Sequence, residues 1–424
     1  MATKYLLRTA AFAALLLAAS ACIYPYEVDI KQGNSYPLVV EGDIHIGSTT
    51  ILSLSHVRPF HDEEYAYTPI VARGYIEGED GTRVDGVSPY ADPVDPGYPG
   101  GGYIGSGYGY ASSYYPGYGS GAPTLIFDTA SLRGDQRYRL HFETVRPYVN
   151  TYESDWLEPC PAPTIDDLSY SKNDEFEELW IGLSMHCHGS HYFRWTFSEN
   201  WEYHSDLYTD LKYVPEERRI GHYYEYGEHN LYYCWNSASS SKINIFSTVN
   251  QIEDRFEKLS FHTIPLSDQR LQVLYRIRVR LEAMSENAYN YWVNIQQNSE
   301  EQGSIFAPTP SEMASNVHCI SDPAVQVMGY LNAAVQADAE MYYDNAQNQF
   351  YKPGRPRNRD DHQVTNTPDS LAYWYHLGYL PYQEIYEAPS ETPSHHMWAL
   401  NSCIDCRRLG GSKTKPDGWP DTHN

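Results

Sequence analysis

Short runs in which apolar and polar residues alternate dominate the first part of the chain. They are PLVVEGDIHI (37–46), TTILSLSHV (49–57), IVARGYIEG (70–78), TLIFDT (124–129) and YRLHFETV (138–145). Alternation with a period of two is typical of strands that bury one face, and the residues between the runs favour turns. The pattern predicts an immunoglobulin-like β-sandwich over residues 37–157.

A second β region follows the proline-rich stretch EPCPAPTI, and we extend it over residues 158–400. Its clearest strand is LYRIRVRLEAM, where Tyr275, Ile277, Val279 and Leu281 share one face and three arginines the other. A further strand is predicted around Val327 to Val335. The expected fold class is therefore mainly β, with two sandwiches in tandem.

One helix and an irregular tail decorate the second sandwich. The segment SENAYNYWVNIQQNSEEQG predicts a helix over about 285–300, with Ser285 as its N-cap. Residues 401–424 contain Cys403, Cys406, two adjacent glycines and two prolines, without helical periodicity. They are expected to form a cysteine-rich C-terminal tail.

The alternating pattern is interrupted over residues 90–123 by a tract of glycine, tyrosine, serine and proline. Such a composition cannot bury a core and predicts a loop. The loop is either a tolerated surface insertion or a contact loop, since tyrosine offers a large contact area at low entropic cost. The candidate contact residues are Tyr103, Tyr108, Tyr110, Tyr114, Tyr115 and Tyr118.

The N-terminus has the features of an export signal. Lys4 and Arg8 precede an apolar run that is too short to span a bilayer, and small residues follow it. Cys22 comes directly after them, as in a bacterial lipobox, although Ala19 stands where leucine is more usual. We expect residues 1–21 to be a lipoprotein signal peptide, Cys22 to be acylated, and residues 22–36 to form a tether. The alternative is an ordinary signal peptide.

The net charge of the chain limits the classes of partner that it can bind. The formal net charge is −25 at pH 7, and cleavage of the signal would remove two cations and no acid. So acidic a body is repelled by nucleic acid phosphates and by anionic lipid. No nucleic acid partner is expected, and contact with the lipid bilayer is expected only through the N-terminal acyl chains.

The remaining six cysteines suggest disulfides in an exported protein. They are Cys160, Cys187, Cys234, Cys319, Cys403 and Cys406. They allow up to three bridges in ~15 connectivities, and the sequence does not choose among these. The Cys-x-x-Cys pair of the tail lacks both a second such pair to complete a zinc site and a βαβ context for redox catalysis. A structural bridge is therefore the preferred interpretation.

No catalytic constellation stands out. His186, His188 and His191 surround Cys187 and could be read as a zinc site, but the HExxH motif is missing and satisfied histidines explain them equally well. Neither a nucleophile elbow nor an EF-hand loop is present in the sequence. We expect no enzyme activity, no metal and no cofactor.

Tyrosine is unusually abundant. The chain has 40 tyrosines and 9 tryptophans, which cluster in residues 221–235 and 373–389. Part of them must pack against strands, whereas polar neighbours such as Glu225, Glu228 and Gln383 indicate that others are exposed. Exposed aromatic side chains are typical of protein interfaces and also of sugar-binding sites.

Three long segments carry a resemblance to a known family. They are PLVVEGDIH, the block from YNYWVNIQQN to MGYLNAA, and the closing CIDCRRLGGSKTKPDGWP. Together they resemble Bacteroidota outer-membrane lipoproteins known only as a domain of unknown function, over nearly the whole mature chain. The resemblance implies a partner, a TonB-dependent outer-membrane barrel protein, and a place, the outer membrane; the Gly/Tyr tract departs from the family pattern.

The expected function is therefore a non-enzymatic accessory or binding subunit of a TonB-dependent outer-membrane transporter, held by lipid. The alternative is a structural subunit of an envelope assembly or surface adhesion complex. Glu27 and Asp29 follow the lipidation site, where acidic residues can direct export to the cell surface. A location facing the outside of the cell is thus favoured.

Overall fold

The computed structural model describes residues 37–57, 70–89, 124–300 and 315–421. Residues 37–424 group into one compact unit, which begins at the Pro37 where the first β pattern begins. The expected signal peptide, Cys22, the tether and the Gly/Tyr tract with its six candidate tyrosines lie outside the described residues. Mainly β structure is confirmed.

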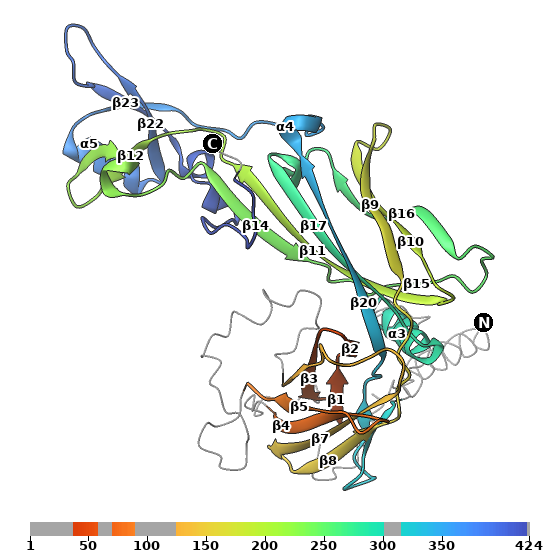
Figure 1. Ribbon diagram of the computed structural model, residues 1–424. Coiled ribbons are helices and arrows are strands. Elements are labelled where there is room, and N and C mark those ends of the chain that lie inside the picture. Colours follow the sequence, from red (N-terminus) through yellow and green to blue (C-terminus); the bar gives the residue numbers. More distant parts are fainter. Residues whose placement is uncertain (1–36, 58–69, 90–123, 301–314, 422–424) are drawn as a thin grey trace, which may run out of the picture. The chain divides into compact units, whose positions relative to one another are not determined.

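The first sheet has nine strands and curls into a nearly closed, barrel-like form (Figure 1). Their order is β18-β8-β7-β4-β5-β6-β3-β1-β19. The bounds are β1 Leu38–Glu41, β3 Thr49–His56, β4 Val71–Gly78, β5 Arg83–Val87, β6 Leu125–Asp128, β7 Tyr138–Arg146, β8 Asn150–Ser154, β18 Val317–Cys319 and β19 Val327–Met328.

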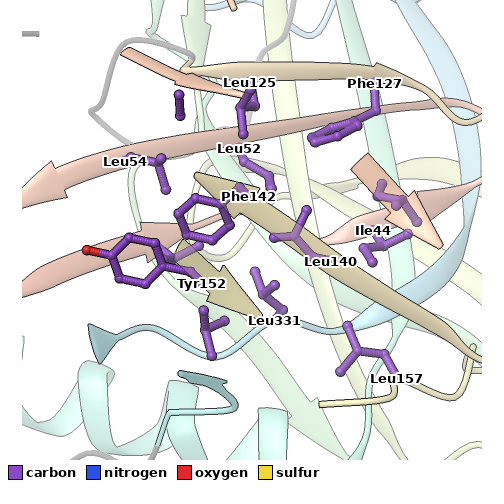
Figure 2. Packing of buried hydrophobic residues seen from close by; sticks show 14 of the residues in the cluster. Ile44, Leu52, Leu54, Leu125, Phe127, Leu140, Phe142, Tyr152, Leu157 and Leu331 are labelled. Carbon is purple, nitrogen blue, oxygen red and sulfur yellow. The ribbon is translucent and has the colours of Figure 1, made fainter. Parts of the chain in front are cut away.

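This sheet closes around one core. Figure 2 shows Leu52, Phe127, Leu140 and Phe142, from three of its strands, pointing toward a common interior. The first body is therefore one curled sheet instead of the expected two-layered sandwich. The difference arises because β18 and β19, which come from far beyond residue 157, extend the sheet along its two edges. Strands of three and two residues leave no pattern that a sequence could reveal.

The second body contains two sheets. A six-stranded sheet has the order β14-β11-β17-β20-β2, with β15 beside β11, and a three-stranded sheet has the order β16-β10-β9. The bounds are β2 Ile44–Ile46, β9 Thr164–Asn173, β10 Glu178–His186, β11 Tyr192–His204, β14 Tyr233–Ser239, β15 Asn244–Ser247, β16 Arg255–Pro265, β17 Leu274–Ala283 and β20 Ala333–Asp344. Side chains of both sheets form one apolar cluster.

The strand β17 confirms one expectation and corrects another. Tyr275, Ile277, Val279 and Leu281 are all buried on one face, as the alternation predicts. On the other face, however, Arg276 is only 2% exposed. The C-terminal tail covers it, because the guanidinium donates to the carbonyl oxygen of Asp417 at 3.0 Å and lies 5.3 Å from the ring of Trp419.

The two bodies are linked by a double crossover. Strand β1 pairs in parallel with β19 in the first sheet, and their continuations β2 and β20 pair in parallel in the second. Gly42 and Gly329 lie at the two breaks, with φ angles of 127° and 115° that L-residues rarely adopt. The expected single strand over 37–46 and the one around 327–335 are therefore each divided at a glycine.

Replacement of Gly329 by alanine is expected to lower the free energy of unfolding by about 2 kcal/mol. The added Cβ would overlap the backbone oxygen of Val40, in addition to the strained φ. Chemical denaturation measures the loss. Gly354→Ala is the control, because no atom lies within 4 Å of a Cβ at that position. Equal stability of the two variants would contradict the close crossover.

Helix α3 Glu286–Glu300 confirms the predicted helix. The Ser285 hydroxyl accepts a hydrogen bond from the amide of Ala288 at 3.2 Å, which is the expected N-cap contact. The other helices are short: α4 Asn345–Asn348, α5 Pro368–His376, α6 Asn401–Ile404, η1 Tyr223–Tyr226, η2 Gln269–Leu271 and η3 Cys406–Leu409. In the part of the chain that the structure describes, every helix is too short or too polar to cross a membrane.

A third group of strands, here called the pocket lobe, has its own core. It consists of the hairpin β12 Leu211–Val214 and β13 Arg219–His222, and of the sheet β21-β23-β22 with helix α5. The sheet strands are β21 His362–Thr365, β22 Tyr379–Ile385 and β23 His395–Leu400. Tyr213, Leu371 and the fully buried Trp398 pack together in this core. The expected second sandwich over 158–400 is thus divided between two cores.

Candidate functional site

A pocket of about 420 Å³ opens between the pocket lobe and the start of the tail. Segments that are far apart in sequence line it: β12, η1, the end of α5, β22, α6 and η3. Figure 1 shows β12, α5 and β22 close together. Helix α5 begins with Pro368 in its first turn and ends before Gly378, whose φ of 88° lets the chain turn into β22. These local signals bring Tyr375 and Tyr379 to the same cavity.

The apolar wall of the pocket is built from tyrosine rings. Tyr213 and Tyr375 lie with their ring centroids 4.8 Å apart, and Tyr213 is also 6.0 Å from Trp398. Tyr213 and Tyr223 are buried, whereas Tyr375 is exposed at its edge. Rings of this kind offer flat apolar faces together with polar hydroxyl groups.

The charged side chains of the pocket are mostly paired. Lys212 donates to Glu228 at 2.5 Å, and Arg407 makes two hydrogen bonds of 2.8 Å to the carboxylate of Asp405. These pairs fix the positions of the two carboxylates. Arg408 also lines the cavity and is exposed.

Burial raises the pKa of the Tyr223 hydroxyl, and the nearby carboxylate of Asp405 raises it further. The hydroxyl therefore stays protonated throughout the physiological pH range. It can donate a hydrogen bond into the cavity but cannot act as a base at neutral pH.

Exposed apolar side chains adjoin the pocket in sequence. Tyr373 is 60% exposed, Leu377 52% and Tyr224 68%, and each is within two residues of a side chain that lines the cavity. We call Tyr224, Tyr373, Tyr375 and Leu377 the aromatic rim. Large exposed apolar groups beside a cavity are more typical of interaction sites than of ordinary surface.

A second candidate is a buried polar cluster at the double crossover. Asp43, His45 and Glu282 bring one ligand atom each to within 4.8 Å of one another, and all three are buried. Arg194 forms ion pairs with both carboxylates, and one of its bonds to Glu282 measures 2.8 Å. The ring of Trp292 from α3 lies 4.9 Å from the guanidinium.

This cluster resembles a metal site in its ligands but not in its charge. Burial raises the pKa of Asp43. Burial acts on Glu282 in the same direction, but Arg194 and His45 outweigh it and hold the Glu282 pKa below its usual value. The guanidinium thus supplies the positive charge that a metal ion would supply. The amide of Asn332 donates to Asp43 at 2.7 Å, so the cluster fastens the crossover.

The histidines near Cys187 are each engaged by another residue of the protein, although the rings of His186 and His188 lie 4.1 Å apart. His186 bonds Asp254 at 2.8 Å, His188 bonds Thr164 at 2.8 Å, and His191 lies 3.4 Å from the hydroxyl of Thr248. Each imidazole therefore has its own partner on the protein. This arrangement favours the interpretation of these residues as satisfied surface histidines.

Among the described cysteines there is one disulfide, which joins Cys234 of β14 to Cys406 of η3. Cys160, Cys187, Cys319 and Cys403 are free thiols. The Cys-x-x-Cys pair thus has one member in a bridge to a distant strand and does not close on itself. The bridge fastens the tail to the six-stranded sheet, close to the hydrogen bond of 2.9 Å from the Tyr203 hydroxyl to the carbonyl oxygen of Cys406.

The four free thiols are expected to react slowly with iodoacetamide at pH 8 in the folded protein. Burial raises the pKa of Cys160 to about 12 and that of Cys187 to about 11, and Cys319 and Cys403 are buried. Since the thiolate is the reactive form, Cys160 and Cys187 hold little of it at pH 8, and burial keeps the reagent away from Cys319 and Cys403. Mass spectrometry after unfolding without reductant should find all four labelled and Cys234 still joined to Cys406. A peptide that links Cys403 to Cys406 would contradict this connectivity.

The pocket was only partly visible in the sequence. The tyrosine clusters at 221–235 and 373–389 contain Tyr223, Tyr375 and Tyr379, which the structure brings together. The tail contributes four further lining residues: Asn401, Asp405, Arg407 and Arg408. In the sequence, only the adjacent charges of Arg407 and Arg408 could have indicated that the tail contributes to a site.

Comparison with known proteins places the chain in a family without supplying a function. None of the curated proteins compared with it matches significantly. The family profile described as "Domain of unknown function (DUF4249)" matches residues 23–340, which is most of the chain. The protein therefore belongs to the DUF4249 family.

Proposed function

We propose that the protein is a non-enzymatic, lipid-anchored accessory subunit of a TonB-dependent transporter in the outer membrane, and that it binds cargo or caps the barrel. In this proposal Cys22 carries the acyl chains and the residues up to Tyr36 form the tether. The resemblance to Bacteroidota outer-membrane lipoproteins supports the location and the partner.

The pocket together with the aromatic rim is the observation that carries a binding role. A cavity of about 420 Å³ has the size of a small-molecule site. Both of its carboxylates are engaged in ion pairs, and its buried tyrosine remains protonated. One imidazole, that of the exposed His376, lines the pocket, and its ring makes no hydrogen bond or ion pair to a described residue that would position it as a base. The lining therefore favours recognition over catalysis.

The rim favours a protein partner beside the cavity. Tyr224 and Tyr373 are 68% and 60% exposed, and tyrosine is enriched among the side chains that become buried at the centre of an interface. Much of the pocket lobe follows residue 340, outside the matched family segment.

Purification of the tagged full-length protein from its native outer membrane in mild detergent tests the proposal. A TonB-dependent barrel recovered in equimolar amounts is expected, together with acyl chains on Cys22. The control variant Cys22→Ser should be lost from the membrane fraction. Recovery of assembly or adhesion proteins in place of the barrel would favour the structural alternative, and recovery of the protein alone after crosslinking would contradict both.

A further inference from the structure

The pocket contains polar groups that the protein does not use itself. Within the described part of the chain, no hydrogen bond is made by the hydroxyls of Tyr213, Tyr223 and Tyr375 or by the side-chain amide of Asn401. All four residues line the same cavity. Polar groups that line a cavity without a protein partner are normally satisfied by water or by a ligand. The cavity is therefore equipped to bind a molecule with several hydroxyl groups.

The charge of the cavity lining indicates the charge of the ligand. Lys212 is neutralised by Glu228, and Arg407 by Asp405. Arg408 lines the cavity with no ion pair to any described residue, so the lining carries an excess of positive charge. This is unusual in a chain whose formal net charge is −25. A local positive site in an acidic protein selects for a negative group on the ligand.

We propose that the pocket binds a small hydroxylated carboxylate, with the chemistry of a sugar acid. The assignment rests on the proposed function as a binding subunit and names the class of cargo. The guanidinium of Arg408 would form a bidentate pair with the carboxylate, which is the geometry that arginine matches best. The hydroxyls of Tyr213, Tyr223 and Tyr375 and the amide of Asn401 would bond the sugar hydroxyls.

The tyrosine rings complete the recognition. The flat apolar face of a pyranose ring packs on aromatic side chains, and Tyr213 and Tyr375 lie 4.8 Å apart on the wall of the cavity. The tyrosine hydroxyls can either donate or accept, as can the two ends of the Asn401 amide. This donor and acceptor set fits the hydroxyls of a sugar acid. An apolar carboxylic acid lacks these hydroxyls and would leave the donors and acceptors without a ligand partner.

Isothermal titration calorimetry of the full chain with glucuronate, glucose and acetate tests the assignment. Glucuronate should bind saturably, and glucose and acetate each at least about tenfold more weakly, because each lacks one half of the recognised chemistry. Arg408→Ala should weaken glucuronate binding about tenfold or more. The matched control is Arg355→Ala, an exposed arginine outside the pocket, which should leave the binding unchanged.

A second variant tests the hydroxyl contacts without removing a ring. Tyr223→Phe should weaken glucuronate binding several-fold and leave the thermal stability of the chain nearly unchanged, since the hydroxyl has no protein partner. The proposal is wrong if glucuronate does not bind at millimolar concentration, if Arg408→Ala binds it as well as the parent, or if glucose or acetate binds equally well. None of these results would bear on a barrel that co-purifies from cells, so failure here is distinguishable from failure of the proposed function.

Discussion

Replacement of Arg194 by methionine is expected to lower the free energy of unfolding by about 3–5 kcal/mol. Methionine keeps much of the side-chain volume but leaves the carboxylates of Asp43 and Glu282 buried without their common cation. Both lie at the double crossover between the two bodies, so the loss should appear in the main unfolding transition. Urea denaturation followed by tryptophan fluorescence measures it.

The loss should depend on pH in a defined direction. Without Arg194, burial and mutual repulsion raise the pKa of at least one carboxyl in the folded variant above its unfolded value. A group with a raised folded pKa contributes stability at low pH and loses it as the pH rises. Arg194→Met should therefore be closer to the parent at pH 5 than at pH 8.

A matched substitution separates this effect from a general loss of charge. Arg280 on β17 forms an ion pair of 2.9 Å with Asp338, but both side chains reach solvent. Arg280→Met should cost less than about 1 kcal/mol, as is usual for surface pairs. The stabilising role of the crossover cluster would be contradicted if Arg194→Met lowered the free energy of unfolding no more than Arg280→Met does. It would also be contradicted if the loss did not change with pH.

Removal of the disulfide by the double replacement of Cys234 and Cys406 with alanine is expected to cost about 2–5 kcal/mol. The bridge closes a loop with a sequence separation of 172 residues, and long loops lose the most entropy when closed. The variant should also release the tail from β14, which would be seen as faster hydrogen exchange at Trp235 and Ser412. These two residues now form an isolated bridge.

Cys403→Ala is the control for this experiment. Its thiol is buried and belongs to the same Cys-x-x-Cys pair, but it forms no disulfide. The substitution removes one sulfur from a packed site and should cost about 1 kcal/mol. If it destabilised the protein as much as the double replacement does, Cys403 would be a partner in the bridge.

Features that depend on local sequence were predictable. The alternation of Tyr275, Ile277, Val279 and Leu281 gave the buried face of β17, and Ser285 with the following periodicity gave helix α3. In both cases neighbours within one element determine the outcome. The same reasoning supports the mainly β class, because alternating runs such as 138–145 coincide with strands such as β7.

Features that depend on distant pairing were not predictable. Nothing in Val327–Met328 indicates that these residues pair in parallel with Leu38 and Val39. Similarly, the burial of Arg276 could not be foreseen, because the covering residues lie in the tail. The expectation of two complete sandwiches failed for this reason, since one sequence cannot show which short strands share a sheet.

The site illustrates the same division. The tyrosine clusters were recognisable as candidate contact surfaces from their composition alone. Their union with Arg407 and Arg408 depends on backbone contacts between remote segments, such as the hydrogen bond of 3.0 Å from the amide of Cys406 to the carbonyl oxygen of Leu231. Only the folded chain shows that the tail is one wall of a pocket.

The fold and the proposed role are connected through the tail. The tail beyond Leu400 is held by the disulfide and by the hydrogen bond from Arg276, and it contacts the pocket lobe. The same tail contributes Asn401 and Arg408 to the lining of the cavity. A loosened tail should therefore weaken binding without abolishing the fold of the two bodies.

Photocrosslinking in native cells tests whether the aromatic rim contacts a TonB-dependent outer-membrane barrel. A photoreactive phenylalanine analogue replaces Tyr373 of the aromatic rim in one strain and Ile252, a fully exposed residue on the connection between β15 and β16, in another. We expect a crosslink from position 373 to a TonB-dependent outer-membrane barrel, and none from position 252. No crosslink to an outer-membrane barrel from position 373, or equal crosslinking from both positions, would contradict it.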